Sequence, residues 1–148
     1  MRISILAVAT REKNEAAVAL AAQYEQRLRQ YAECLSQLVP TESRLFEKAD
    51  AQSGRTRPVL VMLDARGRTM SSEEFAAWIG RERDSGTQHL HFAIGPADGW
   101  SKESRERADL LLSFGPMTFP HELARVMLAE QLYRAFTILA GHPYHGGH

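Results

Sequence analysis

Short apolar runs that alternate with helix-like segments constrain the fold of this chain more than any other feature. The clearest run covers residues 58–63 and reads Pro-Val-Leu-Val-Met-Leu, bounded by a turn-like segment at 64–67. Apolar runs of this kind are typical of strands that are buried in a parallel sheet. Residues 2–9 and 89–94 have the pattern of further strands, and 34–39 and 112–117 of two weaker ones. Strands in alternation with helices predict an α/β fold, a mostly parallel sheet with helices on both faces.

The segments between these strands carry apolar residues at every third or fourth position, as one face of a helix does. Asn14 can cap the first helix, and Ser71 with Glu74 has the spacing of a capping box. Residues 41–57, with a turn signal at Ser53-Gly54, are expected to form a connection with at most a short helix. The predicted helices span 14–31, 71–84, 101–111 and 120–140.

The length and composition indicate one soluble domain, residues 1–148. Hydrophobic residues make up 44% and charged residues 24%, which is ordinary for a globular protein. No apolar run reaches the roughly 18 residues that a membrane span requires. Cys34 is the one cysteine, so no disulfide forms within the chain. We therefore expect a cytoplasmic protein without a membrane partner.

The formal net charge is zero, from 18 basic and 18 acidic side chains. A module that grips bare nucleic acid through its phosphates normally carries a basic excess. This balance disfavours a general RNA-binding module. It leaves room for an enzyme whose target is a shaped site within a larger ribonucleoprotein.

Turn-rich segments follow three of the predicted strands, at residues 64–67, 95–99 and 115–120. Ligands of open α/β sheets bind outside the carboxyl ends of the strands, so these segments are candidates for a shared pocket. None of them matches a phosphate-binding Walker loop or a dinucleotide fingerprint. Nucleoside triphosphates and NAD are therefore disfavoured, and a ligand without phosphate remains possible.

The last predicted helix is apolar around most of its circumference, with a narrow polar stripe at Glu130, Arg134 and Thr137. A helix of this kind must be buried nearly all round. It lies either at the centre of the fold or against a second subunit. In a domain this small we expect the subunit interface, and hence a homodimer.

The tail, residues 141–148, holds His142, Tyr144, His145 and His148 among glycines and a proline. Zinc ligation, a loose terminus, and a tail that packs on or covers the pocket are all compatible with this composition. Metal sites usually draw ligands from stable elements with an oriented second layer of hydrogen bonds. We therefore rank packing or pocket covering first, with acid–base work by the histidines or the tyrosine, and metal binding last.

The second half of the chain resembles the ribosomal large-subunit methyltransferase H family (RlmH), and the likeness extends over essentially the whole chain. The segments that carry it are residues 119–126, 129–135 and 142–145, with Leu63-Asp64, residues 94–95 and 98–101, and the N-terminal strand 3–9. The resemblance implies a SPOUT-class fold with a C-terminal trefoil knot. It also implies a homodimer in which the tail of one subunit lies near the cofactor of the other.

The same resemblance implies an enzyme that uses S-adenosyl-L-methionine. Its expected substrate is N3 of a pseudouridine in the helix 69 loop of 23S ribosomal RNA, within the large subunit or the complete ribosome. The catalytic candidates are His142, Tyr144 and His145, and no metal is expected. The residues that would bind the cofactor are Leu63, Gly95, Pro96, Gly115, Pro116, Met117, Thr118, Phe119 and Pro120.

Two positions depart from the family pattern. Pro96 stands where the family usually has a second glycine, and it removes a backbone amide. Gly146 stands where a basic residue usually follows the last histidine of the motif. These departures keep two alternatives open: a SPOUT methyltransferase for another RNA site, and a non-catalytic ribosome-binding factor on the same fold. A metal-dependent hydrolase that uses His142, His145 and His148 ranks below both.

Overall fold

Strands and helices alternate along the chain, as the sequence predicts. The computed structural model describes residues 1–51 and 54–147, and Ser53 of the predicted turn lies outside them. The elements are β1 (Arg2–Val8), α1 (Glu15–Leu28), β2 (Glu33–Val39), α2 (Glu42–Asp50), β3 (Val59–Thr69), α3 (Ser72–Asp84), β4 (His89–Ile94), α4 (Lys102–Glu106), β5 (Leu110–Ser113), α5 (His121–Ala140) and the 3-10 helix η1 (Pro143–Gly147).

The five strands form one sheet in the order β2-β1-β4-β3-β5, and every neighbouring pair is parallel. β4 lies at the centre of the sheet, between β1 and β3, so strands distant in sequence pair with each other. Because all strands run the same way, their carboxyl ends meet at one edge. This arrangement confirms the predicted α/β class.

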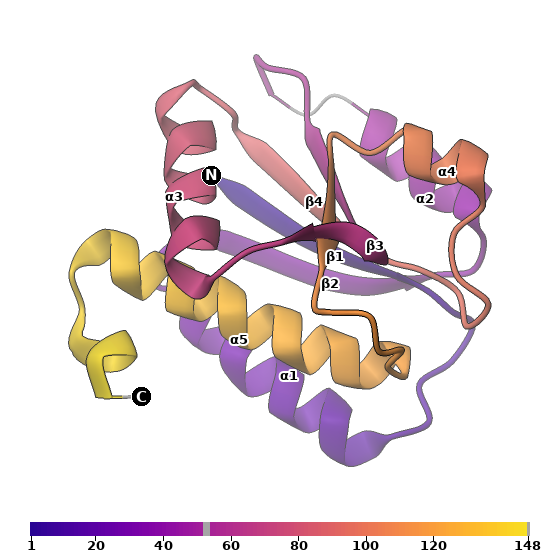
Figure 1. Ribbon diagram of the computed structural model, residues 1–148, viewed down its shortest axis with the longest axis horizontal. Coiled ribbons are helices and arrows are strands. Elements are labelled where there is room, and N and C mark those ends of the chain that lie inside the picture. Colours follow the sequence, from indigo (N-terminus) through magenta and orange to yellow (C-terminus); the bar gives the residue numbers. More distant parts are fainter. Residues whose placement is uncertain (52–53, 148) are drawn as a thin grey trace.

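Helices cover both faces of the sheet (Figure 1). On one face, α1, α3 and α5 pack around a core that includes Phe92 and Leu128, both fully buried. On the other face, α2 and the segment around α4 cover a smaller core that includes Met62 and Trp100. None of the helices in the described part of the chain has the length and apolar composition to cross a membrane.

The helix starts follow from local capping. The Asn14 side chain accepts a hydrogen bond from the backbone N–H of Ala17 (3.0 Å), at the start of α1. Ser71 and Glu74 form the predicted capping box at the start of α3, with both hydrogen bonds present. These side chains satisfy backbone donors that a helix start leaves without partners.

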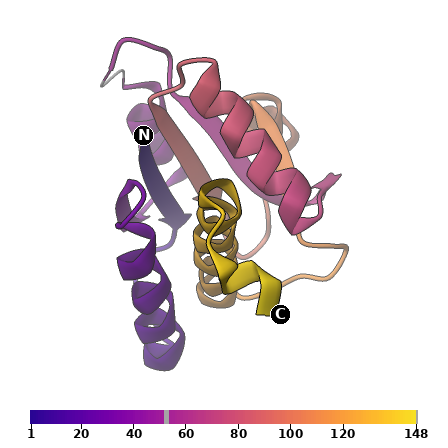
Figure 2. The ribbon, with the colours of Figure 1, turned by 90° about the vertical axis from the view of Figure 1, so that its left-hand side faces the viewer.

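The helix α5 lies between α1 and α3 and packs against both (Figure 2). Leu132 is fully buried and Phe136 is 3% exposed, within a single chain. We expected the apolar residues around α5 to form a subunit interface, but most of them are buried at the centre of the fold within one chain. A smaller set of large apolar side chains remains exposed on α1, on α5 and in the segment before α5, namely Leu20, Met117, Phe119 and Leu123.

Two predicted boundaries are wrong near β5. The helix α4 ends at Glu106 rather than Leu111, and β5 covers 110–113 rather than 112–117. Asp109 explains both, because its backbone N–H donates to the Leu60 carbonyl and its carboxylate accepts from the Leu60 N–H, each at 2.8 Å. These two hydrogen bonds draw the chain into the sheet earlier than its local sequence indicates.

The predicted turn at residues 64–67 lies inside β3, which continues to Thr69. β5 pairs first with residues up to Leu63 and then, after a register shift, with Arg68 and Thr69. Gly67 lies against β5 so closely that a Cβ there would be 2.6 Å from the Leu111 carbonyl. The end of β3 thus pairs with the same part of β5 a second time, while the trefoil knot itself stays a prediction.

Candidate functional site

Residues 63–66 of β3, at its register shift with β5, meet the ends of β4 and β5 at one edge of the sheet, which we call the carboxyl edge and define as residues 63–66, 95–100 and 113–115. The indole N–H of Trp100 donates to the Leu63 carbonyl (2.9 Å). The Ser113 hydroxyl donates to the Ala65 carbonyl (3.1 Å). The structure therefore brings residues of all three segments to one edge, although residues 64–67 belong to β3 rather than to a turn after it.

The glycines of this edge are required for different reasons. Gly115 has a φ of 111°, and Gly99 has a φ of 83°, both in the left-handed region that favours glycine. Gly95 has no such φ, and the indole of Trp100 instead occupies the space where its side chain would stand. Glycine at 95 is thus explained by packing, whereas glycine at 115 is explained by the backbone turn that leads out of β5.

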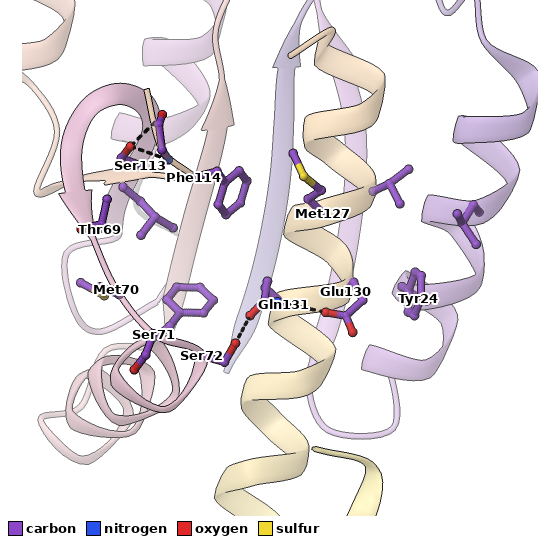
Figure 3. A pocket seen from close by; sticks show the side chains of 15 residues that line it. Tyr24, Thr69, Met70, Ser71, Ser72, Ser113, Phe114, Met127, Glu130 and Gln131 are labelled. Carbon is purple, nitrogen blue, oxygen red and sulfur yellow. Dashed lines mark hydrogen bonds between the residues drawn. The ribbon is translucent and has the colours of Figure 1, made fainter. Parts of the chain in front are cut away.

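A cavity of about 560 Å³ lies beside the carboxyl edge, between the start of α3, the end of β5, α1 and α5 (Figure 3). Its walls are mostly apolar, and Glu130 is the one charged residue among the described residues that line it. The lining residues are Leu20, Tyr24, Thr69, Met70, Ser71, Ser72, Phe75, Leu112, Ser113, Phe114, Gly115, Val126, Met127, Glu130 and Gln131. A cavity of this size and character suits a small organic ligand without phosphate groups.

The predicted cofactor residues fall into two groups relative to this cavity. Gly115 lines it directly. Leu63, Gly95 and Pro96 belong to the carboxyl edge but not to the cavity lining. The segment 116–120 is exposed and leads from the cavity into α5. Met117 is 75% exposed and Phe119 40% exposed, so both are available to a ligand or a second chain.

A chain of hydrogen bonds crosses the polar side of the cavity (Figure 3). The Ser72 hydroxyl donates to Gln131 Oε1 (2.7 Å), and Gln131 Nε2 donates to Glu130 Oε1 (3.2 Å). Glu130 also pairs with Arg134 one turn later (2.7 Å). From the sequence, Glu130 was identified only as part of the polar stripe on the last helix. That stripe was the sequence feature that could have indicated a functional carboxylate.

The tail is an ordered 3-10 helix that packs on α5, so its glycines and proline did not make it loose. The Tyr144 hydroxyl donates to Glu130 Oε2 (2.8 Å). Its ring lies against the Tyr133 ring, with centroids 4.7 Å apart. Burial, and then the hydrogen bond to Glu130, raise the pKa of Tyr144 well above its usual value. Tyr144 is therefore a hydrogen-bond donor at neutral pH rather than a base.

The two described histidines of the tail differ in their surroundings. His142 is exposed, and its Nδ1 accepts from the Tyr144 backbone N–H (3.1 Å). His145 is half-buried, and its Nδ1 has no hydrogen-bond partner among the described residues. His148 lies outside the described residues. Across residues 1–51 and 54–147, no three His, Cys, Asp or Glu side chains gather in a group that could hold a metal ion.

The sequence matches a known protein family over nearly its whole length. The family model described as "Predicted SPOUT methyltransferase" matches residues 1–145. Ribosomal RNA large subunit methyltransferase H of Koribacter versatilis is 52% identical over 136 residues, which is 92% of each chain. The protein of the same name from Brucella abortus is 54% identical over 106 residues, which is 69% of this chain and 63% of that relative.

Solved structures show the same fold at low sequence identity. A probable methylase family protein from Haemophilus influenzae has a TM-score of 0.60 and 13% identity, over 96% of this chain and 69% of its own. The SpoU methyltransferase AviRb from Streptomyces viridochromogenes has a TM-score of 0.56 and 16% identity, over 95% of this chain and 61% of its own. With the family model and the relative from Koribacter, these matches lead to one assignment: the chain belongs to the SPOUT methyltransferase family.

Proposed function

We propose that this protein transfers a methyl group from S-adenosyl-L-methionine to RNA of the large ribosomal subunit. The observation that carries the proposal is the 52% identity, over 92% of both chains, to a protein named ribosomal RNA large subunit methyltransferase H. The finer target, N3 of a pseudouridine in the helix 69 loop of 23S ribosomal RNA, is supported by the tail and helix motifs that carry the family resemblance.

The carboxyl edge and the cavity beside it fit a sulfonium cofactor. No Lys or Arg is found among the described residues of the lining, and S-adenosylmethionine carries no phosphate that would need one. Leu63, Gly95, Pro96 and the segment 115–120 are the residues proposed to hold it. Pro96 contributes no backbone N–H, so the amides at this edge must come from its neighbours.

The cofactor, when bound, supplies an electrophilic methyl carbon, and the protein must align the attacking nitrogen and accept its proton. The Glu130 carboxylate already accepts hydrogen bonds from Gln131, Arg134 and Tyr144, so its proposed role is to hold these groups in place at the cavity wall. The Tyr144 hydroxyl and the Arg134 guanidinium fix that carboxylate in place. His142 and His145 remain the predicted proton acceptors.

The protein is also proposed to act as a homodimer. The exposed apolar residues Leu20, Met117, Phe119 and Leu123 belong to the same three segments that line the cavity or lead into it. A second copy on this face would cover them and enclose the cavity. Light scattering should give twice the chain mass of 16.6 kDa. A monomer at micromolar concentration contradicts this part of the proposal.

The neutral net charge predicts the form of the substrate. With no basic excess, nonspecific attraction to phosphates is small, and recognition must depend on shape and a few placed contacts. We expect efficient methylation of assembled ribosomal particles and weak binding to short free RNA. The test measures methyl transfer from labelled cofactor to naked ribosomal RNA, isolated large subunits and complete ribosomes, and maps the modified nucleotide.

The outcomes of this test separate the alternatives. Transfer to another nucleotide would indicate a SPOUT enzyme with a different RNA site. No transfer together with no cofactor binding by calorimetry would indicate a ribosome-binding factor without activity. Efficient transfer to naked RNA with a steep salt dependence would contradict the reasoning from charge.

A further inference from the structure

Trp100 is a buried residue that contacts two segments of the carboxyl edge, at Leu63 and at Gly95. It is 4% exposed and belongs to the smaller core, on the face covered by α2 and α4. Its indole N–H donates to the Leu63 carbonyl at 2.9 Å. Leu63 is the last residue of β3 before the register shift with β5. Leu63 is partly buried, and without this donor its carbonyl would lose the hydrogen bond that the indole provides.

The same indole fixes the end of β4. A Cβ on Gly95 would be 2.8 Å from Cε2 and 2.9 Å from Nε1 of Trp100, so the ring lies directly on the Gly95 backbone. One side chain therefore contacts both Leu63 and Gly95, which come from neighbouring strands. Each of these two residues is a proposed cofactor ligand.

The backbone of Trp100 continues this connection. Its carbonyl accepts a hydrogen bond from the Arg105 guanidinium (3.0 Å) and from that of Arg66 (3.5 Å). Arg66 is held in turn by two hydrogen bonds to the Asp64 carboxylate, each at 2.9 Å. The residues after β3 are thus tied to the residues after β4 through both the ring and the main chain of Trp100.

We propose that Trp100 is a positioning residue of the cofactor site, which acts by fixing the Leu63 peptide and the Gly95 backbone in one arrangement. The inference rests on the proposed function, because it takes the carboxyl edge to be the cofactor site. Ligand recognition by backbone groups depends on peptide planes that are fixed before the ligand arrives. Loss of the indole N–H frees the Leu63 peptide to rotate and weakens the cofactor contacts at both strand ends.

The central test is Trp100→Phe, which keeps an aromatic ring and removes the N–H donor. Trp78→Phe, on α3 and the opposite face of the sheet, is the matched control. For Trp100→Phe we expect the Kd and KM for S-adenosylmethionine to rise about tenfold, the effect of one lost buried hydrogen bond. The kcat at saturating cofactor should stay within about twofold, since the residue touches no reacting atom. The control should change neither value.

Two further measurements keep the test decisive if Trp100→Phe folds poorly. In the Trp78→Phe protein, the remaining indole of Trp100 should change its fluorescence when S-adenosylhomocysteine binds. Gly95→Ala, whose methyl group would displace the buried Trp100 ring, should also raise the cofactor Kd and lower the thermal unfolding midpoint.

The results distinguish this inference from the proposed function. If the wild type binds the cofactor and Trp100→Phe binds it equally well, Trp100 is a core residue only and the inference is wrong. If the fluorescence of the Trp100 indole does not change while the ligand binds to saturation, the inference is wrong as well. If the wild type itself binds no cofactor, the proposed function fails, and the inference fails with it.

Discussion

His91 should make the stability of this protein depend on pH between about 4 and 7. It lies in β4 and is 4% exposed, and neither ring nitrogen has a hydrogen-bond partner among the described residues. Burial, and then the neighbouring His89 and Arg2, lower the pKa of His91 from 6.5 to about 4. The His89 ring lies 4.0 Å from the His91 ring, centroid to centroid.

The sign follows from proton linkage. Below pH 6.5 the unfolded chain binds a proton at residue 91 that the folded chain excludes until pH falls to about 4. Stability is therefore greatest above pH 6.5 and is lost as pH falls through this window. Between pH 7 and pH 5 the loss amounts to about 2 kcal/mol, and it approaches about 3 kcal/mol below pH 4.

The assay is urea unfolding of the wild type and of His91→Leu at pH 7 and pH 5. Leucine fills much of the same volume and cannot take up a proton, so the variant should lack this part of the pH dependence. The difference between the two proteins should change by about 2 kcal/mol from pH 7 to pH 5. His142→Gln, on the exposed tail, serves as the control. Equal pH dependence in the wild type and His91→Leu would refute the reasoning.

Three further changes test the packing and the tail. Phe136→Ala should lower the free energy of unfolding by about 3–5 kcal/mol, since the ring is 3% exposed within one chain; a change seen only in the dimer dissociation constant would place it at an interface. Arg125→Met should cost about 3 kcal/mol, because it removes the guanidinium that pairs with the buried Glu25 carboxylate (2.9 Å); calorimetry checks this. Tyr144→Phe should slow methyl transfer about tenfold and change stability by less than about 1 kcal/mol, whereas a normal rate would remove Tyr144 from the proposed site.

The sequence predicted those parts of the fold that depend on local signals. The capping box at Ser71, the cap at Asn14 and the apolar run of β3 all act within a few residues, and all were found. The errors occur where distant segments decide the outcome. The turn expected at residues 64–67 became strand because β5 pairs on both sides of it.

The candidate site also has parts that local sequence predicts and parts that depend on distant segments. The segments after β4 and β5 were predictable, because a parallel sheet places all carboxyl ends at one edge. Glu130 was visible only as part of a polar stripe, since its contact with Tyr144 depends on how the tail folds back. Likewise, Gly95 was expected to contact a ligand. In the structure, glycine is required at this position because the Trp100 ring occupies the space of a side chain, and no local pattern indicates where that ring lies.

The placement of α5 between α1 and α3 has a consequence for how the protein is made. β1 pairs not only with β2 but also with β4, which lies much later in the chain. The face of the sheet above β1 and β4 is closed by α5, which comes later still. During synthesis, that face stays open to water until α5 has left the ribosomal tunnel. Folds dominated by such distant pairings form slowly and expose apolar surface meanwhile. A nascent chain that stalls before residue 121 therefore presents to chaperones and proteases the part of the sheet that α5 would cover.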